Sequence, residues 1–265
     1  MEITNKTRKI PLVSSSITEK RPVSIFAQIN LNVFWIANNF HWQALLAIVI
    51  PSMVAKFLGD ANKDINLTIV VFWGTLVAVI VNPLAGAASD YVTFRMGRRR
   101  PFMIIGTILN GIVLVAFAFA PNLPTGILLF MFAFLFLLLQ FSNNVANSPW
   151  SAIIADNVPS HQRGLTAGFN GLFTLLGTII GSVVAGLIVN KNDPLPLYRN
   201  EIVQIFLLIA VVQILFVAYT VLTVKETPLP PNSTLPFVSC RSCASFSSSP
   251  LVILICHGCC WHASS

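Results

Sequence analysis

Six long apolar segments constrain the fold of this chain more than any other feature. None contains Asp, Glu, Lys or Arg, and the shortest has 20 residues. A bilayer core about 30 Å thick needs roughly 20 residues at about 1.5 Å of rise each, so every segment can cross a membrane as a helix. The sequence therefore predicts an all-α, multi-pass membrane protein, a six-helix bundle embedded in a lipid bilayer. The expected spans are 26–52, 67–89, 101–120, 125–147, 165–189 and 202–224.

Lys and Arg are distributed unequally between the two sides of these spans. Eleven lie on the side that carries the amino-terminal tail, whereas four lie on the opposite side, at Lys56, Lys63, Lys191 and Arg199. Basic residues next to spans favour the cytoplasm. We therefore expect both ends of the six-helix unit to be cytoplasmic and the membrane to be the plasma (cell inner) membrane. Topology and anionic lipids account for the net charge of +7, so no nucleic-acid partner is expected.

The loop between the second and third expected spans is the most basic part of the chain. It reads Gly86-Ala-Ala-Ser-Asp90-Tyr-Val-Thr-Phe-Arg95-Met-Gly97-Arg-Arg-Arg-Pro101. Asp90 ends one span and can pair with the Arg cluster, Gly97 allows a tight turn, and Pro101 suits the first turn of the next helix. A generic basic loop that only sets the topology is the alternative interpretation.

The pattern of this loop resembles the connection between helices two and three of the major facilitator superfamily. Gly97 follows Asp90 by seven residues, which is similar to the longer spacing of the sucrose- and glycoside-type branch. The segment 143–164, with its paired Asn, Pro149, Ala-Asp and Arg-Gly, resembles the end of helix four and the following loop in the same branch. The resemblance covers about residues 26–228. It implies the amino-terminal six-helix half of a twelve-helix transporter.

The resemblance also implies a role for the basic loop. In family members this loop bridges to the other half, so we expect it to control the change of conformation and not to contact the solute. The residues expected to form this conformational switch loop are Gly86, Asp90, Arg95, Gly97, Arg98, Arg99 and Arg100.

Three regions are expected along the chain. Residues 1–24 form a cytoplasmic amino-terminal tail, and residues 25–225 form the six-helix half. Residues 226–265 are rich in Pro, Ser and Cys and contain no further span, so they are expected to be disordered or an aberrant end. Because family members bind solute between two halves, we expect a second six-helix half or a homodimer partner, or else a truncated product.

Neutral polar residues are patterned on two of the spans. At about 100° per residue, those of the first span and those of the fourth each fall within a narrow arc. Amides buried in lipid need partners, so these arcs face either other helices or a water-filled cavity. We interpret them as a solute-binding surface. The residues concerned are Asn32, Trp35, Asn39, Trp42, Gln43, Gln140, Asn143, Asn144 and Asn147.

Two further features of the spans bear on mechanism. His41 lies away from the polar arc of the first span and is a possible coupling residue, since imidazole can carry a proton near neutral pH; a structural hydrogen bond is the alternative. The fifth span is lined by Gly, with Gly177 and Gly181 as a small-residue pair that permits close helix packing.

The most consistent function is secondary transport of a neutral small solute, a sugar or glycoside, by alternating access. Amides match hydroxyl groups, and Trp35 and Trp42 offer flat faces for a sugar ring. The branch resemblance implies symport with a cation, although no carboxylate lies in these spans to carry a proton. The alternatives are half of a drug or metabolite exporter and a truncated membrane protein that does not transport.

Catalytic and metal chemistry are not expected. Asp156 and His161 lie in a loop without a nucleophile, so an enzyme is not expected. Cys240-x-x-Cys243 and Cys256-x-x-Cys259 have the spacing of a zinc ribbon, but the Ser-rich and apolar residues between them lack its strand and turn signals. We therefore expect no metal and no cofactor.

Overall fold

A computed structural model describes residues 22–58, 63–91, 97 and 99–224. They all belong to one unit, Met1–Glu226. The remaining unit, Thr227–Ser265, lies outside the described residues, and so do the predicted Cys-rich tail and Arg95 and Arg98 of the basic loop. The described part of the chain contains no β-strand. Its elements are α1 (Ile25–Asn32), α2 (Phe34–Ala44), the π-helical turn η1 (Leu45–Val49), α3 (Ile50–Leu58), α4 (Lys63–Tyr91), α5 (Arg100–Phe119), η3 (Ala120–Asn122), α6 (Thr125–Asn157), η4 (Ser160–Gln162), α7 (Arg163–Ile188) and α8 (Leu195–Thr223).

Six helical segments are long and apolar enough to cross a membrane, as predicted. The first is composite, because α1, α2, η1 and α3 follow one another from Ile25 to Phe57. Two boundaries differ most from the expected spans. The fourth helix continues to Asn157 through Pro149, and the sixth begins at Leu195, where Pro196 stands in the first turn. Polar residues can extend a helix beyond the bilayer, so the apolar run underestimates helix length.

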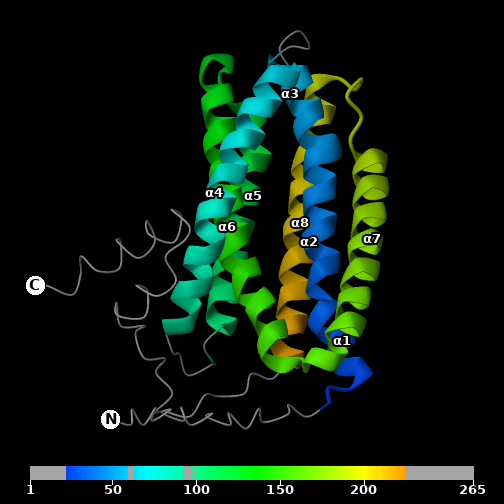
Figure 1. The fold of residues 1–265 in the computed structure, drawn as a ribbon. Helices are drawn as coiled ribbons and strands as arrows, with labels where there is room; N and C mark the ends of the chain where they lie inside the picture. Colours follow the sequence, from blue (N-terminus) through cyan, green and yellow to red (C-terminus); the bar gives the residue numbers. More distant parts are fainter. Residues whose placement is uncertain (1–21, 59–62, 92–96, 98, 225–265) are drawn as a thin grey trace, which may run out of the picture. The chain divides into compact units, whose positions relative to one another are not determined.

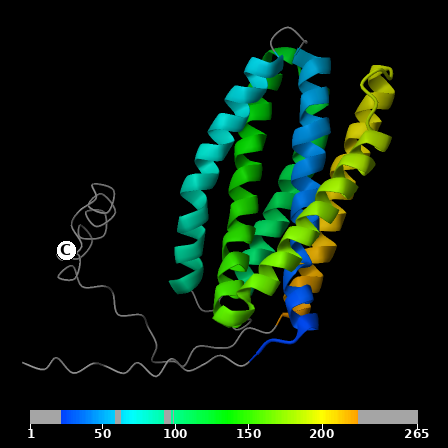
Figure 2. The same ribbon diagram turned by 45° about the vertical axis from the view of Figure 1, so that its right-hand side comes forward.

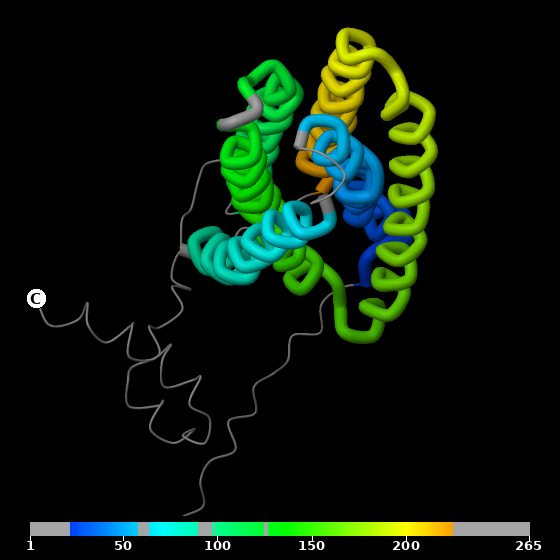
Figure 3. Tube along the Cα trace, turned by 90° about the horizontal axis from the view of Figure 1, so that it is seen from above, coloured from blue at the N-terminus to red at the C-terminus, as the bar shows by residue number. Residues whose placement is uncertain are grey.

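The helices pack as two neighbouring groups (Figure 1). α2 contacts mainly α7 and α8, α6 contacts mainly α4 and α5, and α5 packs on α8. The view turned by 45° separates α4 from α7, and the view from above places them on opposite sides of the bundle (Figures 2 and 3). The apolar core therefore lies among α2, α5, α6 and α8, around Phe117, Phe132 and Phe206.

Two interruptions shape the first membrane-spanning segment. Val33 separates α1 from α2, and the π-helical turn η1 separates α2 from α3. Pro51 follows η1 by two residues and has no amide hydrogen; its ring would clash with the carbonyl one turn earlier in a regular helix. The wider π turn relieves that clash. A helical-wheel arc drawn over a straight helix is therefore only approximate here.

Close helix contacts depend on glycine at a few positions. A Cβ at Gly181 would lie 2.7 Å from the carbonyl oxygen of Phe40, and Gly177 faces the backbone of Ile36 as closely. The predicted packing role of this pair between α7 and α2 is confirmed. A Cβ added at Gly164, Gly168 or Gly171 would meet no atom within 4 Å, so these three glycines do not extend that packing.

Candidate functional site

Three pairs of side chains join α2 to α6 across the middle of the bundle. Trp42 meets the edge of Phe136 at 6.2 Å between ring centroids, and Asn143 Nδ2 donates to Asn38 Oδ1 at 3.0 Å. The third pair is Trp35 and Trp150, with ring centroids 4.9 Å apart. These three pairs, the α2–α6 bridge, use residues one or two turns apart on each helix, so one face of α2 is directed at one face of α6.

Most residues of the predicted solute-binding surface lie on or beside the α2–α6 bridge. Asn32, Asn143 and Asn144 are buried, whereas the others are half-buried. The side-chain amide of Asn143 is already hydrogen-bonded to Asn38, and Asn144 Nδ2 donates to the carbonyl oxygen of Gln140 within α6. Asn39 Nδ2 donates to the Trp35 carbonyl and, at 3.4 Å, to Thr174 of α7. The half-buried members are Trp35, Asn39, Trp42, Gln43, Gln140 and Asn147.

Three polar atoms around Trp35 and Trp150 lack a hydrogen-bond partner among the described residues. They are Trp35 Nε1, Asn32 Oδ1 and Asn147 Oδ1, and all three are buried. Asn32 precedes Trp35 by three residues, and Asn147 precedes Trp150 by three, so each amide lies about one helical turn from a ring. One donor and two acceptors therefore lie within about one turn of these two Trp residues along the chain. A buried polar atom is unfavourable unless it is bonded, so these three atoms are candidate contacts for a polar ligand.

Two contacts hold the side chain of Trp150 in place. Its Nε1–H donates to the carbonyl oxygen of Leu31 at 2.8 Å, next to the interruption at Val33. Its ring also packs on Phe34, with centroids 5.5 Å apart. Trp150 thus hydrogen-bonds a backbone carbonyl group beside the interruption, and its ring packs against that of Trp35.

His41 lies on a different side of α2. It is fully buried, and its Nδ1 lies 2.8 Å from Oε1 of Gln213 in α8. The sequence placed His41 outside the polar arc, and its contact with α8 agrees with that interpretation. The sequence did not identify its partner.

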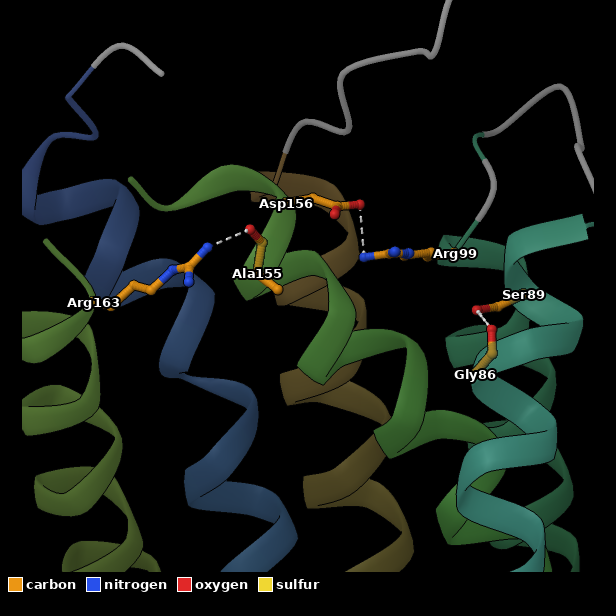
Figure 4. A network of polar contacts seen from close by, with 6 residues as sticks. All are labelled: Gly86, Ser89, Arg99, Ala155, Asp156 and Arg163. Atoms are coloured by element: carbon orange, nitrogen blue, oxygen red, sulfur yellow. Dashed lines mark hydrogen bonds and ion pairs between the residues drawn. The ribbon is translucent and has the colours of Figure 1, made fainter. Parts of the chain in front are cut away.

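The switch loop is described in part (Figure 4). Gly97 has a φ of 111°, a backbone conformation that favours glycine. Residues 92–96 and 98 lie outside the described residues, so the predicted tight turn stays a prediction. Arg99, which is buried, forms an ion pair with Asp156 at the end of α6 at 2.9 Å, and Arg163 donates to the carbonyl oxygen of Ala155. The side chain of Asp90 lies outside the described residues, and its predicted pairing with the Arg cluster stays a prediction.

The rest of the switch loop fixes helix ends. Ser89 Oγ donates to the carbonyl oxygen of Gly86 at 2.7 Å, and a Cβ at Gly86 would lie 2.8 Å from Ser148 Oγ. Arg100 is the first residue of α5, followed by Pro101 in the first turn, as predicted. The described parts of this loop therefore join α4, α5 and α6 at one end of the bundle.

Several polar residues of the interior were missed by the sequence analysis. Asn110 of α5 donates to Ser142 of α6 at 3.1 Å, and Thr166 of α7 donates to Gln28 of α1 at 3.0 Å. The sequence did contain a signal for such residues, namely a single amide in an otherwise apolar run, as at Asn110 and Gln213. Such an amide requires a partner on a neighbouring helix.

The family model of the Major Facilitator Superfamily matches residues 31–264. The chain belongs to this superfamily. The matched range includes most of the six described spans and both predicted loop patterns. The superfamily consists of membrane transporters, so this membership supports the expectation of a transporter in place of an enzyme. Together with the six apolar helices it confirms an integral, multi-pass membrane protein. Among the described residues, no group of His, Cys, Asp and Glu is arranged to hold a metal.

Curated relatives agree with the predicted branch. The general alpha-glucoside permease of Schizosaccharomyces pombe is 29% identical over 61% of this chain and 31% of its own length. A sucrose transport protein of Arabidopsis thaliana is 26% identical over 64% of this chain and 37% of its own. Solute carrier family 45 member 4 of Homo sapiens is 28% identical over 70% of this chain and 25% of its own. The chain thus spans between a quarter and two fifths of these relatives, and similarity to the sucrose and glycoside branch is confirmed.

Proposed function

We propose that this six-helix unit binds a neutral sugar or glycoside as part of a secondary transporter that works by alternating access. The observation that carries the proposal is the set of unpaired polar atoms beside Trp35 and Trp150. Sugar hydroxyls both donate and accept, so they suit an indole N–H such as that of Trp35 and amide oxygens such as those of Asn32 and Asn147. The aromatic faces suit the apolar face of a sugar ring.

The half-buried amides extend this surface. Asn39, Gln43 and Gln140 join Trp42 on the faces of α2 and α6, and none of these side chains is charged. A surface without a charge favours a neutral solute, because an ionic solute transferred from water would lose hydration without gaining a counter-ion. Two of the similar proteins are named for sucrose and for alpha-glucosides, which supports the same solute class.

The proposed transport cycle needs a second six-helix unit, either another protein half or a second copy of this chain. The ion pair between Arg99 and Asp156, with Gly86, Gly97 and Arg100, belongs to the proposed switch, together with Asp90, Arg95 and Arg98. Both ends of the unit are proposed to be cytoplasmic, in the plasma membrane, and a cation is proposed to move with the sugar.

Sugar binding can be tested on the purified chain in lipid nanodiscs by calorimetry with sucrose and with maltose. Trp35→Phe keeps a ring but removes the indole donor, so we expect binding about five-fold weaker, since one hydrogen bond contributes about 1 kcal/mol. Trp73→Phe, at an exposed position of α4, is the matched control and should leave the affinity unchanged. Absence of saturable binding of either sugar, or equal effects of the two substitutions, would contradict the proposal.

A further inference from the structure

The pair formed by His41 and Gln213 has a defined hydrogen-bond direction. Gln213 Oε1 can only accept, so His41 Nδ1–H donates across the 2.8 Å contact between α2 and α8. In the neutral ring this leaves a lone pair on Nε2. The geometry therefore holds the imidazole in the tautomer that can take up a proton at Nε2.

The two remaining nitrogens of this pair are both unpaired. His41 Nε2 and Gln213 Nε2 find no hydrogen-bond partner among the described residues, and the two side chains are 0% and 2% exposed. A purely structural bridge between two helices would be expected to satisfy its buried polar atoms. These unpaired nitrogens therefore indicate a further task for the pair.

Charged residues on the elements around His41 lie at the helix ends. α1, α2 and η1 carry none, α5 carries Arg100, α6 carries Asp156, α7 carries Arg163, and α8 carries Arg199 and Glu201. Glu201 is twelve residues from Gln213, which is about 18 Å along the helix. His41 is thus the one imidazole within the interior of the described spans, whereas the charged side chains of these elements lie near their ends.

Trp42 connects this pair to the proposed solute surface. Its ring stacks on the imidazole of His41, with centroids 4.9 Å apart and planes inclined by 23°. The same ring meets Phe136 in the α2–α6 bridge. An imidazolium under an indole face gains a cation–π contact, so a change of charge on His41 acts directly on Trp42.

We propose that His41, held by Gln213, is the protonation site of this six-helix unit, and that Trp42 links its charge to sugar binding. The inference rests on the proposed function. One N–H bond forms at Nε2 when a proton arrives from water, and it breaks when that proton returns to water; Nδ1–H keeps its bond to Gln213. A buried charge without a counter-ion is unfavourable, so protonation favours a conformation in which water reaches the pair.

The protonation site can be tested without transport, by titrating tryptophan emission with pH in nanodiscs. An imidazolium stacked on indole quenches its emission, so the wild-type chain should show a quenching step on acidification. The step should be lost in His41→Gln and in Trp42→Phe. It should be retained in His161→Gln, since His161 is an exposed residue of η4 and serves as the matched control. A step that survives in His41→Gln would overturn the inference.

A second measurement covers the case in which His41→Gln does not fold. Nitrogen NMR on the chain with labelled histidine reports the tautomer directly, and we expect one buried imidazole that carries its hydrogen on Nδ1. Gln213→Leu should change that signal and leave the other histidines unaltered. A buried imidazole protonated on Nε2 in the wild type would overturn the proposal.

The link to sugar is read from sucrose affinity on either side of the quenching step. We expect the wild-type dissociation constant to change about two- to five-fold, the size of one cation–π contact, and to stay constant in His41→Gln. A constant affinity in both proteins would overturn the link. If sucrose does not bind while the quenching step behaves as expected, the proposed function fails and the protonation site stands.

Discussion

The glycines of α7 differ in what surrounds them, and that difference predicts the effect of substitution. A Cβ at Gly181 would meet the backbone of Phe40 in α2, which cannot move aside, whereas Gly171 has open space. We expect Gly181→Ala to destabilise the bundle by about 1–3 kcal/mol, the usual cost of overpacking. Gly171→Ala should be neutral or stabilising by up to about 1 kcal/mol, because alanine favours helix.

Thermal unfolding of the two variants in the same detergent measures this difference. Equal midpoints for Gly181→Ala and Gly171→Ala would show that α7 does not depend on close approach to α2. The Gly177–Gly181 pair was visible in the sequence because its spacing brings both onto one helix face. The open space around Gly164, Gly168 and Gly171 could not be predicted from the sequence, because residue spacing within a helix does not reveal where the adjoining helix diverges.

At the scale of the elements, the ion pair of Arg99 and Asp156 joins the start of α5 to the end of α6. Asp156 is half exposed, so the pair should contribute less than about 1 kcal/mol to stability. If it belongs to the conformational switch, Asp156→Asn should slow sugar uptake into proteoliposomes and leave the sucrose dissociation constant unchanged. Asp193→Asn, in the connection between α7 and α8, is the control. A large loss of affinity in Asp156→Asn would refute the switch role.

The elements show what could be predicted from the sequence and what could not. The length of the apolar segments and their lack of charged residues were enough to predict six spans, because a bilayer imposes a minimum apolar length. The interruption at Val33 was not predictable, since it is stabilised by Trp150 from another helix, more than a hundred residues away. Likewise, the arcs identified Asn143 as inward-facing, but only packing determines that it bonds Asn38.

At the scale of the whole molecule, the six spans are buried very unequally. The most apolar windows of α4 and α7 are only 11% and 17% buried, against 44–50% for the other four. α4 packs on α6 and α7 packs on α2, on opposite sides of the bundle (Figure 3), so these two exposed helices flank the α2–α6 bridge. A solute held against a single six-helix unit would stay open to lipid or water on that side. The proposed function therefore requires a second unit to cover it.

Cysteine cross-linking tests that requirement. In a chain whose five native Cys are replaced by Ser, we expect Leu172→Cys on α7 to cross-link two six-helix units in membranes. Ile108→Cys on α5, which is exposed to a similar extent, should not. Native mass spectrometry of the detergent-purified chain should agree, with a species heavier than the 28.9 kDa monomer. A monomer without cross-links at Leu172 would mean that the chain transports nothing by itself, since the solute surface would have no opposing wall between which alternating access could occur.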